Sequence, residues 1–371
     1  MQEFILKELV TKDIESELEK IGFDIAYRTK AKDKFLYKTF KIFDLTLPQA
    51  NILKQTALSF GADCGVHREV LVNKIDRTDV ILGGSFSQIK KICEKLKQQP
   101  FAMKTLAENL LRQLETKKTE TKLVGILNVT PDSFSDGGKY FNSEEAIKYF
   151  YQLVEDGADV IDIGAESTRP GAKSICSQEQ IERLRPILKV VSKAKISTSI
   201  DTRCSEVARF ALDNGVNIVN DVSGLDYDSK MIDVVKEYDA SIVLQHSTGE
   251  TNNIIEYNDV VEEVYLTLLK KAKLAKEKGV DKVILDVGIG FGKTKENSYT
   301  ILNRIEEFKS LNYPLMVGVS RKSLLGLQNS EDNVLKDSLS LALAYPLMQA
   351  GIDYLRVHNV KLHRKLLNLV V

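Results

Sequence analysis

From about residue 123 to the end of the chain, short apolar runs alternate with longer amphipathic segments. The runs are rich in Val, Ile and Leu and have the length of buried parallel strands. We therefore predict strands at residues 123–128, 160–164, 196–201, 217–221, 241–246, 283–286, 314–319 and 354–358. The segments between them have helical periodicity, and several close on a glycine, the residue that most easily adopts the left-handed turn after a helix. These glycines are Gly157, Gly215, Gly279 and Gly351.

A strand followed by a helix, repeated eight times in about 250 residues, is typical of a (β/α)8 barrel, the TIM barrel. A doubly wound open sheet is the structural alternative, because it also alternates strands with helices. The repeat shows no additional edge strands, which favours the closed barrel. The sequence thus predicts an α/β fold with a TIM barrel at its carboxyl-terminal end.

The first third of the chain lacks this regular alternation. A strand-like run at 78–84, a helical pattern at 85–100 and another at 103–115 predict a small α/β module over residues 1–116. A charged linker at 117–122 would join it to a catalytic domain at 123–371. The module contains no constellation of catalytic residues, so we expect it to have a structural or oligomerisation role.

Charge and cysteine content narrow the class of protein. The chain has 52 Lys and Arg residues and 52 Asp and Glu residues. It therefore carries no net charge that would attract nucleic acid or an anionic membrane. The four cysteines are scattered and have no zinc-site spacing, which is typical of reduced thiols in a cytoplasmic protein. There is no signal peptide and no apolar run long enough to span a bilayer. We expect a cytoplasmic protein with no nucleic-acid or membrane partner.

Each predicted barrel strand carries a polar residue at or near its carboxyl end. In a TIM barrel these ends form one rim, where the active site is built. A single Asp or Asn there is most simply a capping residue, but a polar group on every strand is harder to explain by capping, because a buried unpaired polar group costs about 1–3 kcal/mol. The rim residues are Asn128, Asp162, Asp201, Asn220, Asp221, Gln245, His246, Asp286, Ser320, Arg321, Lys322, Arg356 and His358.

The chemistry of this rim favours one class of ligand. Arg169, Lys322, Arg356 and His358 supply cations suited to a phosphate group. Asp201, Asn220 and Asp286 supply acceptors and an amide, which match the amino and ring N–H groups of a flat heterocycle. The guanidinium of Arg356 can also stack on such a ring. We predict a planar nitrogen heterocycle that carries a phosphate or diphosphate.

The segment GIGFGKT at 288–294 resembles a P-loop, which requires G-x-x-x-x-G-K-[ST]. The first glycine of that motif would stand at position 287, which is Val287. The segment also follows a late barrel strand rather than opening a nucleotide-binding domain. We therefore reject an ATPase function, although Lys293 is still a candidate to lie near a ligand.

Six segments of the carboxyl-terminal domain closely resemble, in order, the motifs of dihydropteroate synthases. They are NVTPDSFSDGG, ESTRPGA, SIDT, ILDVGIGFGK, VGVSRKSLLG and YLRVHNV, and the resemblance covers about residues 120–371. The resemblance implies a transferase of the folate pathway that joins 6-hydroxymethyl-7,8-dihydropterin diphosphate to p-aminobenzoate and uses Mg²⁺. It also implies a homodimer. The first 116 residues lie outside the motifs.

The resemblance also implies roles for individual residues. Asp201, Lys322, Arg356 and His358 would be the catalytic residues. The pterin would be held by Asp201, Asn220, Asp286, Lys322 and Arg356, and the diphosphate by Asn128, Thr168, Arg169, Arg356 and His358. Asn128 would also contact the magnesium ion. Phe134, Pro170 and Ser320 would line the p-aminobenzoate side.

Two other functions remain open at this point. A methyltransferase that uses methyltetrahydrofolate would keep the Asp and Asn groups for the pterin but would not need the NVTPDSF and STRPG loops or the RVH segment. A non-catalytic pterin-binding protein would keep the fold without turnover. The chain departs from the family pattern at Val287, at Asn297 and within 245–251.

Overall fold

The computed structural model describes residues 5–10, 13–115, 119–130, 143–166, 175–247, 254–327 and 332–370. The chain divides into two compact units, residues 1–117 and 118–371. Their hydrophobic cores are made from separate sets of side chains. Each unit is therefore described by itself.

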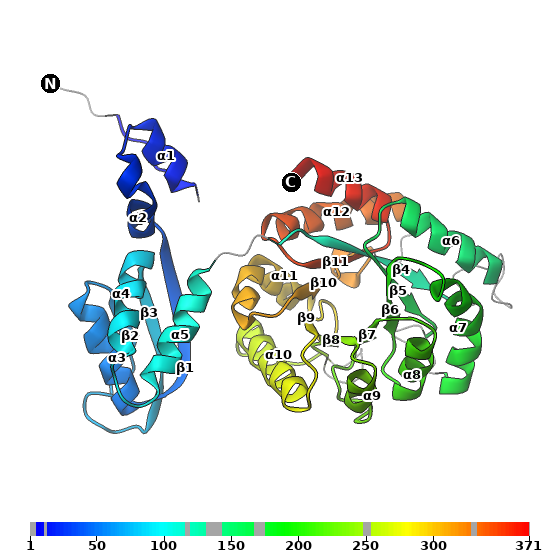
Figure 1. The fold of residues 1–371 in the computed structure, drawn as a ribbon, viewed down its shortest axis with the longest axis horizontal. Coiled ribbons are helices and arrows are strands. Elements are labelled where there is room, and N and C mark those ends of the chain that lie inside the picture. Colours follow the sequence, from blue (N-terminus) through cyan, green and yellow to red (C-terminus); the bar gives the residue numbers. More distant parts are fainter. Residues whose placement is uncertain are drawn as a thin grey trace. The chain divides into compact units, whose positions relative to one another are not determined.

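The amino-terminal unit is a three-stranded antiparallel sheet with helices (Figure 1). The strands are β1 (Tyr37–Thr46), β2 (Asp63–Val66) and β3 (Arg77–Ser85), with β3 in the centre. The helices are α1 (Ile14–Lys20), α2 (Ile25–Phe35), α3 (Leu47–Ser59), α4 (Phe86–Leu96) and α5 (Met103–Leu114). The strand and two helices predicted at 78–115 are confirmed, and α4 ends at Leu96 rather than at residue 100.

A capping box explains why α4 begins where it does. Ser85 Oγ accepts a hydrogen bond from the Gln88 backbone N–H at 3.3 Å, and Gln88 Oε1 accepts one from the Ser85 N–H at 2.8 Å. The buried face of α4 and α5 then packs on β3 through Leu82, Ile89 and Met103. The predicted small α/β module is thus present.

The second unit is a closed barrel of eight parallel strands, as predicted (Figure 1). Its strands are β4 (Lys122–Asn128), β5 (Val160–Gly164), β6 (Ser197–Asp201), β7 (Ile218–Asp221), β8 (Ser241–Gln245), β9 (Val283–Asp286), β10 (Leu315–Val317) and β11 (Tyr354–Val357). Each pairs with the next in sequence, and β11 closes the ring against β4. The strand β4 begins at Lys122, one residue before the start predicted at 123.

Helices surround this barrel. They are α6 (Ser143–Glu155), α7 (Ser177–Val191), α8 (Ser205–Asp213), α9 (Met231–Glu237), α10 (Val260–Glu277), α11 (Lys295–Asn303), α12 (Asn333–Gln349) and α13 (Val360–Val370), with short 3-10 turns η2 (Ile305–Leu311) and η3 (Ser323–Leu325). All four predicted helix-closing glycines adopt positive φ, for example 91° at Gly157. No helix of the described segments is long and apolar enough to cross a membrane.

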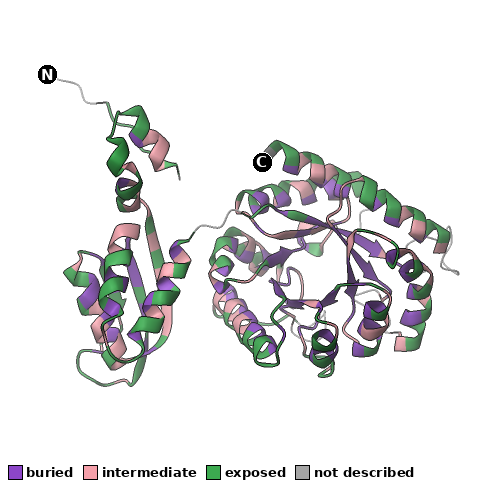
Figure 2. Cartoon of the chain, in the orientation of Figure 1, coloured by how far each residue is buried: buried purple, intermediate pink, exposed green. Residues whose placement is uncertain are grey.

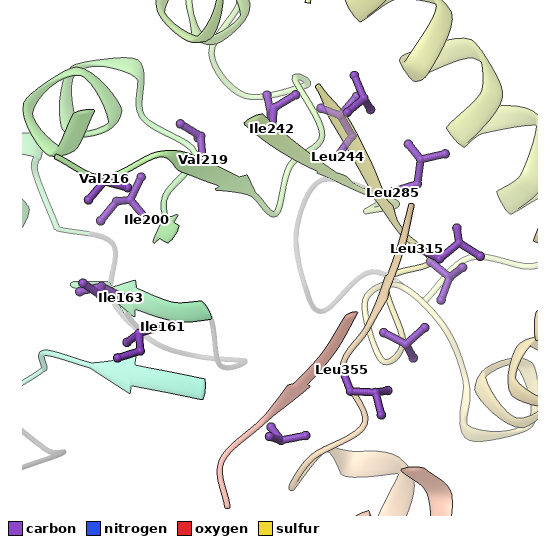
Figure 3. Close-up of a cluster of buried hydrophobic side chains, with 14 of the residues drawn as sticks. Ile161, Ile163, Ile200, Val216, Val219, Ile242, Leu244, Leu285, Leu315 and Leu355 are labelled. Carbon is purple, nitrogen blue, oxygen red and sulfur yellow. The ribbon is translucent and has the colours of Figure 1, made fainter. Parts of the chain in front are cut away.

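Two buried layers result from the alternation of side chains along the strands. Outward-facing residues such as Ile161, Leu244 and Leu355 pack against the helices and form the largest core (Figures 2 and 3). Inward-facing residues fill the barrel, so its interior is a packed core rather than a pore. The chemistry is therefore confined to the carboxyl ends of the strands.

Candidate functional site

The barrel interior has an apolar floor and a polar rim. The floor is one buried cluster of Val124, Val160, Ile218, Val243, Ile284 and Met316. Two residues further along, on the same interior face, four of these strands carry polar side chains: Asp162, Asn220, Gln245 and Asp286. The strand alternation that builds the core thus also collects the predicted site residues on one rim.

A half-buried arginine held by two buried aspartates lies at the centre of this rim. Arg356 Nε donates to Asp162 Oδ2 at 2.6 Å, and Arg356 Nη2 donates to Asp201 Oδ2 at 2.7 Å. Asp162 is 1% exposed and Asp201 7% exposed. Desolvation of the guanidinium lowers the pKa of Arg356, but the neighbouring carboxyl groups of Asp162 and Asp201 outweigh this effect, so the pKa is raised. Burial raises the pKa of Asp201 to about 7 although Arg356 opposes that shift.

Three buried oxygen acceptors beside this arginine lack a hydrogen-bond donor in the described part of the chain. They are Asp162 Oδ1, Asp201 Oδ1 and Asn220 Oδ1. Asn220 Nδ2 donates to Asp162 Oδ2 at 3.0 Å, so the amide oxygen is turned away from that bond. Buried polar atoms are nearly always paired, with protein, water or ligand. Three acceptors without donors at one rim can thus receive the N–H groups of a ligand or the hydrogens of ordered water.

Asp286 and Lys322 form the opposite side of the rim. Asp286 Oδ1 accepts the Gly288 backbone N–H at 2.7 Å, and Lys322 Nζ donates to the Ile289 carbonyl at 2.7 Å. Burial raises the pKa of Asp286, with Lys322 opposing the shift. Burial also lowers the pKa of Lys322 to about 8, and Asp286 opposes that change. Both groups are thus held by the loop that follows β9.

Ser320 and His358 lie at the ends of neighbouring strands β10 and β11. Ser320 Oγ lies 3.0 Å from His358 Nδ1 and accepts the His358 backbone N–H at 3.2 Å. Asn128 ends β4 and is half-buried. A side chain at Gly164 would meet Asn128 Oδ1 at 3.4 Å and Asp201 Cβ at 3.5 Å, so the glycine leaves room between them. The structure brings these residues to the rim that carries Arg356.

Four predicted site residues lie outside the described segments of the chain. They are Phe134, Thr168, Arg169 and Pro170. Their assigned contacts with phosphate and p-aminobenzoate stay predictions.

Two strand-end residues have structural roles. Asp221 accepts hydrogen bonds from Ser223 N at 2.9 Å, Ser223 Oγ at 2.6 Å and Leu225 N at 2.8 Å, which caps the turn after β7. His246 lies 2.9 Å from the ammonium of Lys293. The structure thus favours a capping role for Asp221 and a role in the buried core for His246, rather than a direct contact with a ligand.

Sequence reasoning placed Asp162 on the second strand but gave it no role. Only the partners of Asp162 reveal its importance, since it holds both Arg356 and Asn220. The signal in the sequence was weak: an acidic residue in the middle of an apolar strand, where burial of a charge requires a partner.

In the described part of the chain, no three His, Cys, Asp or Glu side chains are grouped so that they could hold a metal ion. Mg²⁺ commonly keeps waters and uses the phosphates of a substrate as ligands.

The family comparison agrees with this geometry. A sequence model described as pterin binding enzyme matches residues 124–358. The dihydropteroate synthase of Bacillus subtilis is 39% identical over 250 residues, covering 66% of this chain and 85% of the relative. The probable bifunctional folylpolyglutamate synthase/dihydropteroate synthase of Haloferax volcanii is 33% identical over 344 residues. That match covers 84% of this chain but only 40% of the relative's length.

A third relative matches along nearly the whole chain. The bifunctional dihydropteroate synthase/dihydropteroate reductase of Helicobacter pylori is 32% identical over 369 residues, covering 97% of this chain and 96% of the relative. This match takes in the amino-terminal unit, which the motif resemblance left out.

Solved structures show the same relationship for the barrel. Xanthomonas albilineans dihydropteroate synthase with 4-aminobenzoic acid has a TM-score of 0.63 and 35% identity, covering 67% of this chain and 92% of that chain. Anaplasma phagocytophilum dihydropteroate synthase with bound 6-hydroxymethylpterin-monophosphate has a TM-score of 0.61 and 35% identity, covering 68% of this chain and 100% of that chain. The chain belongs to the pterin-binding enzyme family, and its barrel belongs with the dihydropteroate synthases.

Proposed function

We propose that the barrel joins 6-hydroxymethyl-7,8-dihydropterin diphosphate to p-aminobenzoate, giving 7,8-dihydropteroate and diphosphate for folate synthesis. The observation that carries this proposal is the set of three buried acceptors without donors beside Arg356. The pterin ring offers amino and ring N–H groups that would satisfy them. Relatives solved with a pterin monophosphate and with 4-aminobenzoic acid support both halves of the reaction.

Different rim residues would contact different sides of the pterin ring. Asp162, Asp201 and Asn220 would accept the N–H groups along one side of the ring, and Asp286 those on another. Arg356 bonds both aspartates from the edge that carries Nε and Nη2, which leaves its planar face for stacking on the ring. Lys322 would donate to a ring acceptor.

In the reaction, the neutral aniline nitrogen of p-aminobenzoate forms a bond to the pterin methylene carbon. The carbon–oxygen bond to the diphosphate breaks, and the leaving diphosphate takes the electron pair, while the aniline nitrogen loses a proton. Positive charge that develops on the methylene would be offset by the Asp201 carboxylate, and His358 with Arg356 would stabilise the departing anion. No strong base is required, because the nucleophile is already neutral.

Asn128 is the residue we propose for magnesium. It ends β4 beside Gly164, at the edge of the rim, and would supply one amide oxygen. An ion with one protein ligand, waters and substrate phosphates fits the preferences of Mg²⁺. Bound there, the ion would neutralise charge on the leaving diphosphate.

Ser320 is the described residue proposed for the p-aminobenzoate side. Its bonds to His358 fix the hydroxyl between β10 and β11, next to the group assigned to the diphosphate. Phe134 and Pro170 would close over this side, with Thr168 and Arg169 meeting phosphate.

The two other functions are less well supported. A methyltransferase would use the same acceptors for its pterin, but the Bacillus subtilis and Xanthomonas albilineans relatives that match over the barrel are dihydropteroate synthases. A non-catalytic binding protein would not need the Ser320–His358 pair beside the pterin groups.

We also propose that the chain forms a homodimer through α12. One face of this helix exposes apolar side chains: Val334 is 78% exposed, Leu335 42%, Leu339 37% and Tyr345 48%. Large apolar side chains exposed on one helix are candidates for a protein interface. A second copy of the same helix would cover them.

The cellular location stays a proposal as well. All four cysteines are free thiols, with Cys64 and Cys93 buried. Burial raises the pKa of both thiols to about 11, which keeps them unreactive. Unpaired cysteines fit the reducing cytoplasm that we predicted.

A second candidate function concerns the amino-terminal unit. The relative that matches 97% of this chain is named a dihydropteroate reductase as well as a synthase. We propose that the amino-terminal unit supports such a reduction, in place of the purely structural role expected from the sequence. The step would add a hydride and a proton to the remaining C=N bond of dihydropteroate, with a reduced nicotinamide or reduced flavin as the hydride donor.

The synthase activity is tested with the purified full chain, dihydropterin diphosphate and p-aminobenzoate, with and without Mg²⁺. We expect dihydropteroate and diphosphate in equal amounts, formed only with the metal. A folded chain that binds pterin but forms no product would contradict the proposed reaction and favour the binding-protein alternative.

Above pH 7, where the Asp201 carboxyl group is ionised, replacing Asp201 by Asn should lower kcat/KM by about 100-fold, because a preorganised charge at the reacting carbon is removed. The exposed Asp233 on α9 provides the matched control, Asp233→Asn, which should leave turnover unchanged. Near-normal turnover of the Asp201 variant would rule out the electrostatic role.

The raised pKa of Asp201 also predicts a pH dependence of stability. The folded protein holds the Asp201 proton up to about pH 7, whereas an unfolded chain loses it near about pH 4. The contribution of Asp201 to stability is therefore largest at low pH and falls as the pH rises between these values. The free energy of unfolding of the wild type, relative to Asp201→Asn, should decrease from pH 5 to pH 8 in urea titrations. An increase would contradict the assignment.

Replacing Leu339 by Glu should convert the dimer to a monomer in light scattering coupled to gel filtration, since a charge would be buried in the interface. Leu274→Glu on α10, at a side chain that is 44% exposed, is the control and should stay dimeric. A wild type that is monomeric, or a Leu339 variant that stays dimeric, would exclude this interface.

The reductase proposal predicts that dihydropteroate drives the oxidation of NADH, NADPH or reduced flavin by the full chain. The reaction without dihydropteroate is the control. If none of the three donors is oxidised faster with dihydropteroate than without it, the proposed reduction is wrong.

A further inference from the structure

Lys293 is a buried lysine that the proposed reaction does not use. It lies at the end of the loop between β9 and α11 and is 6% exposed. Its Nζ lies 2.9 Å from His246 Nδ1 and donates to the carbonyls of Gly288 at 2.9 Å and Phe291 at 3.0 Å. In the described structure it forms no ion pair with a carboxylate. The His246 carbonyl, 3.4 Å away, is a fourth acceptor, so the ammonium is surrounded by acceptors and the side chain does not reach outward as a P-loop lysine would.

The loop that surrounds this ammonium also supports two groups of the pterin rim. Its Gly288 N–H donates to Asp286, and its Ile289 carbonyl accepts from Lys322. The ring of Phe291 lies 5.0 Å from Lys322 Nζ, within cation–π range. The orientation of Asp286 and of Lys322 therefore depends on the path of residues 288–291.

That path runs directly against the end of β8. Gly288 has φ +65°, and a Cβ there would lie 1.9 Å from the His246 carbonyl oxygen. Lys293 crosses the same junction, since it contacts both the His246 side chain and the Gly288 carbonyl. The ammonium thus ties the end of β8 to the loop that follows β9.

We propose that Lys293, with His246 as its acceptor, is a positioning residue that holds loop 288–291 so that Asp286 and Lys322 can bind the pterin. This inference rests on the proposed function. It assigns a role to the lysine of the P-loop-like segment and to the histidine at the end of β8. Neither residue would touch the substrate.

The charge states of the groups around the ammonium agree with this arrangement. Burial, and the nearby Lys293, lower the pKa of His246 to about 3, so the imidazole stays neutral and accepts through Nδ1. Burial lowers the pKa of Lys293 to about 7, with Asp286 opposing and Lys322 reinforcing the shift. Either form of the amine can still donate to the two carbonyls.

The test compares Lys293→Met with Lys295→Met. Lys295 is exposed in the same segment and is the matched control. We expect Lys293→Met to weaken the binding of pteroic acid, measured by calorimetry without p-aminobenzoate, by about tenfold or more, the effect of losing charged hydrogen bonds that order the site. The KM for dihydropterin diphosphate should rise more than kcat falls. Lys295→Met should bind like the wild type.

His246 provides a readout that a merely structural role would not change. His246→Ala removes the acceptor, whereas His246→Asn keeps an acceptor close to the position of Nδ1. Pterin affinity should fall in the Ala variant and recover in the Asn variant, and the double variant Lys293→Met, His246→Ala should bind no worse than Lys293→Met alone. Equal affinities of the Ala and Asn variants, or a Lys293→Met affinity within twofold of the wild type, would overturn the proposal.

Failure of this inference and failure of the proposed function give different results. A wild type that does not bind pteroic acid refutes the pterin site itself. A wild type that binds and turns over, alongside a Lys293→Met variant that does the same, refutes only the positioning role.

Discussion

The pair of bonds from Arg356 to Asp162 and Asp201 depends on the closure of the barrel. Asp162 and Arg356 are 194 residues apart in the chain and meet only because β11 pairs with β4, next to β5. Burying the carboxyl groups of Asp162 and Asp201 carries a desolvation cost, which is offset only when their geometry with Arg356 is good. The register of these strands therefore sets the geometry of the rim, and the helices keep that register by packing on the outer faces of the strands.

The same barrel strands carry both the apolar side chains that stabilise the interior and the polar side chains of the rim. Apolar side chains such as Val243 and Ile284 fill its lower interior, while the next inward-facing positions carry Gln245 and Asp286. Because side chains alternate with a period of two, a slip of one residue would turn each polar group into the outer hydrophobic layer. The alternation of side chains along the strands thus determines both the apolar residues that stabilise the barrel interior and the polar residues at its rim.

That alternation is also what could be predicted from the sequence. The strands, the closed barrel and the placement of Asp201, Asn220, Asp286 and Arg356 on one rim follow from short apolar runs that end in polar residues. The first strands and helices of the amino-terminal unit were not predicted, since β1 alternates only weakly in burial. The support given by Asp162 and Lys293 was also missed, because it depends on partners distant in sequence.

The unpaired acceptors bear on whether this barrel is a catalyst or an inert scaffold. Each buried acceptor without a donor destabilises the fold by about 1–3 kcal/mol, and Asp162, Asp201 and Asn220 each contribute one. Replacing such groups by apolar residues of similar volume is often neutral or stabilising. A barrel that served only as a scaffold would become more stable if these polar residues were replaced by apolar ones. The three acceptors beside Arg356 therefore fit the proposed ligand, whose N–H groups would pair with them and remove this cost on binding.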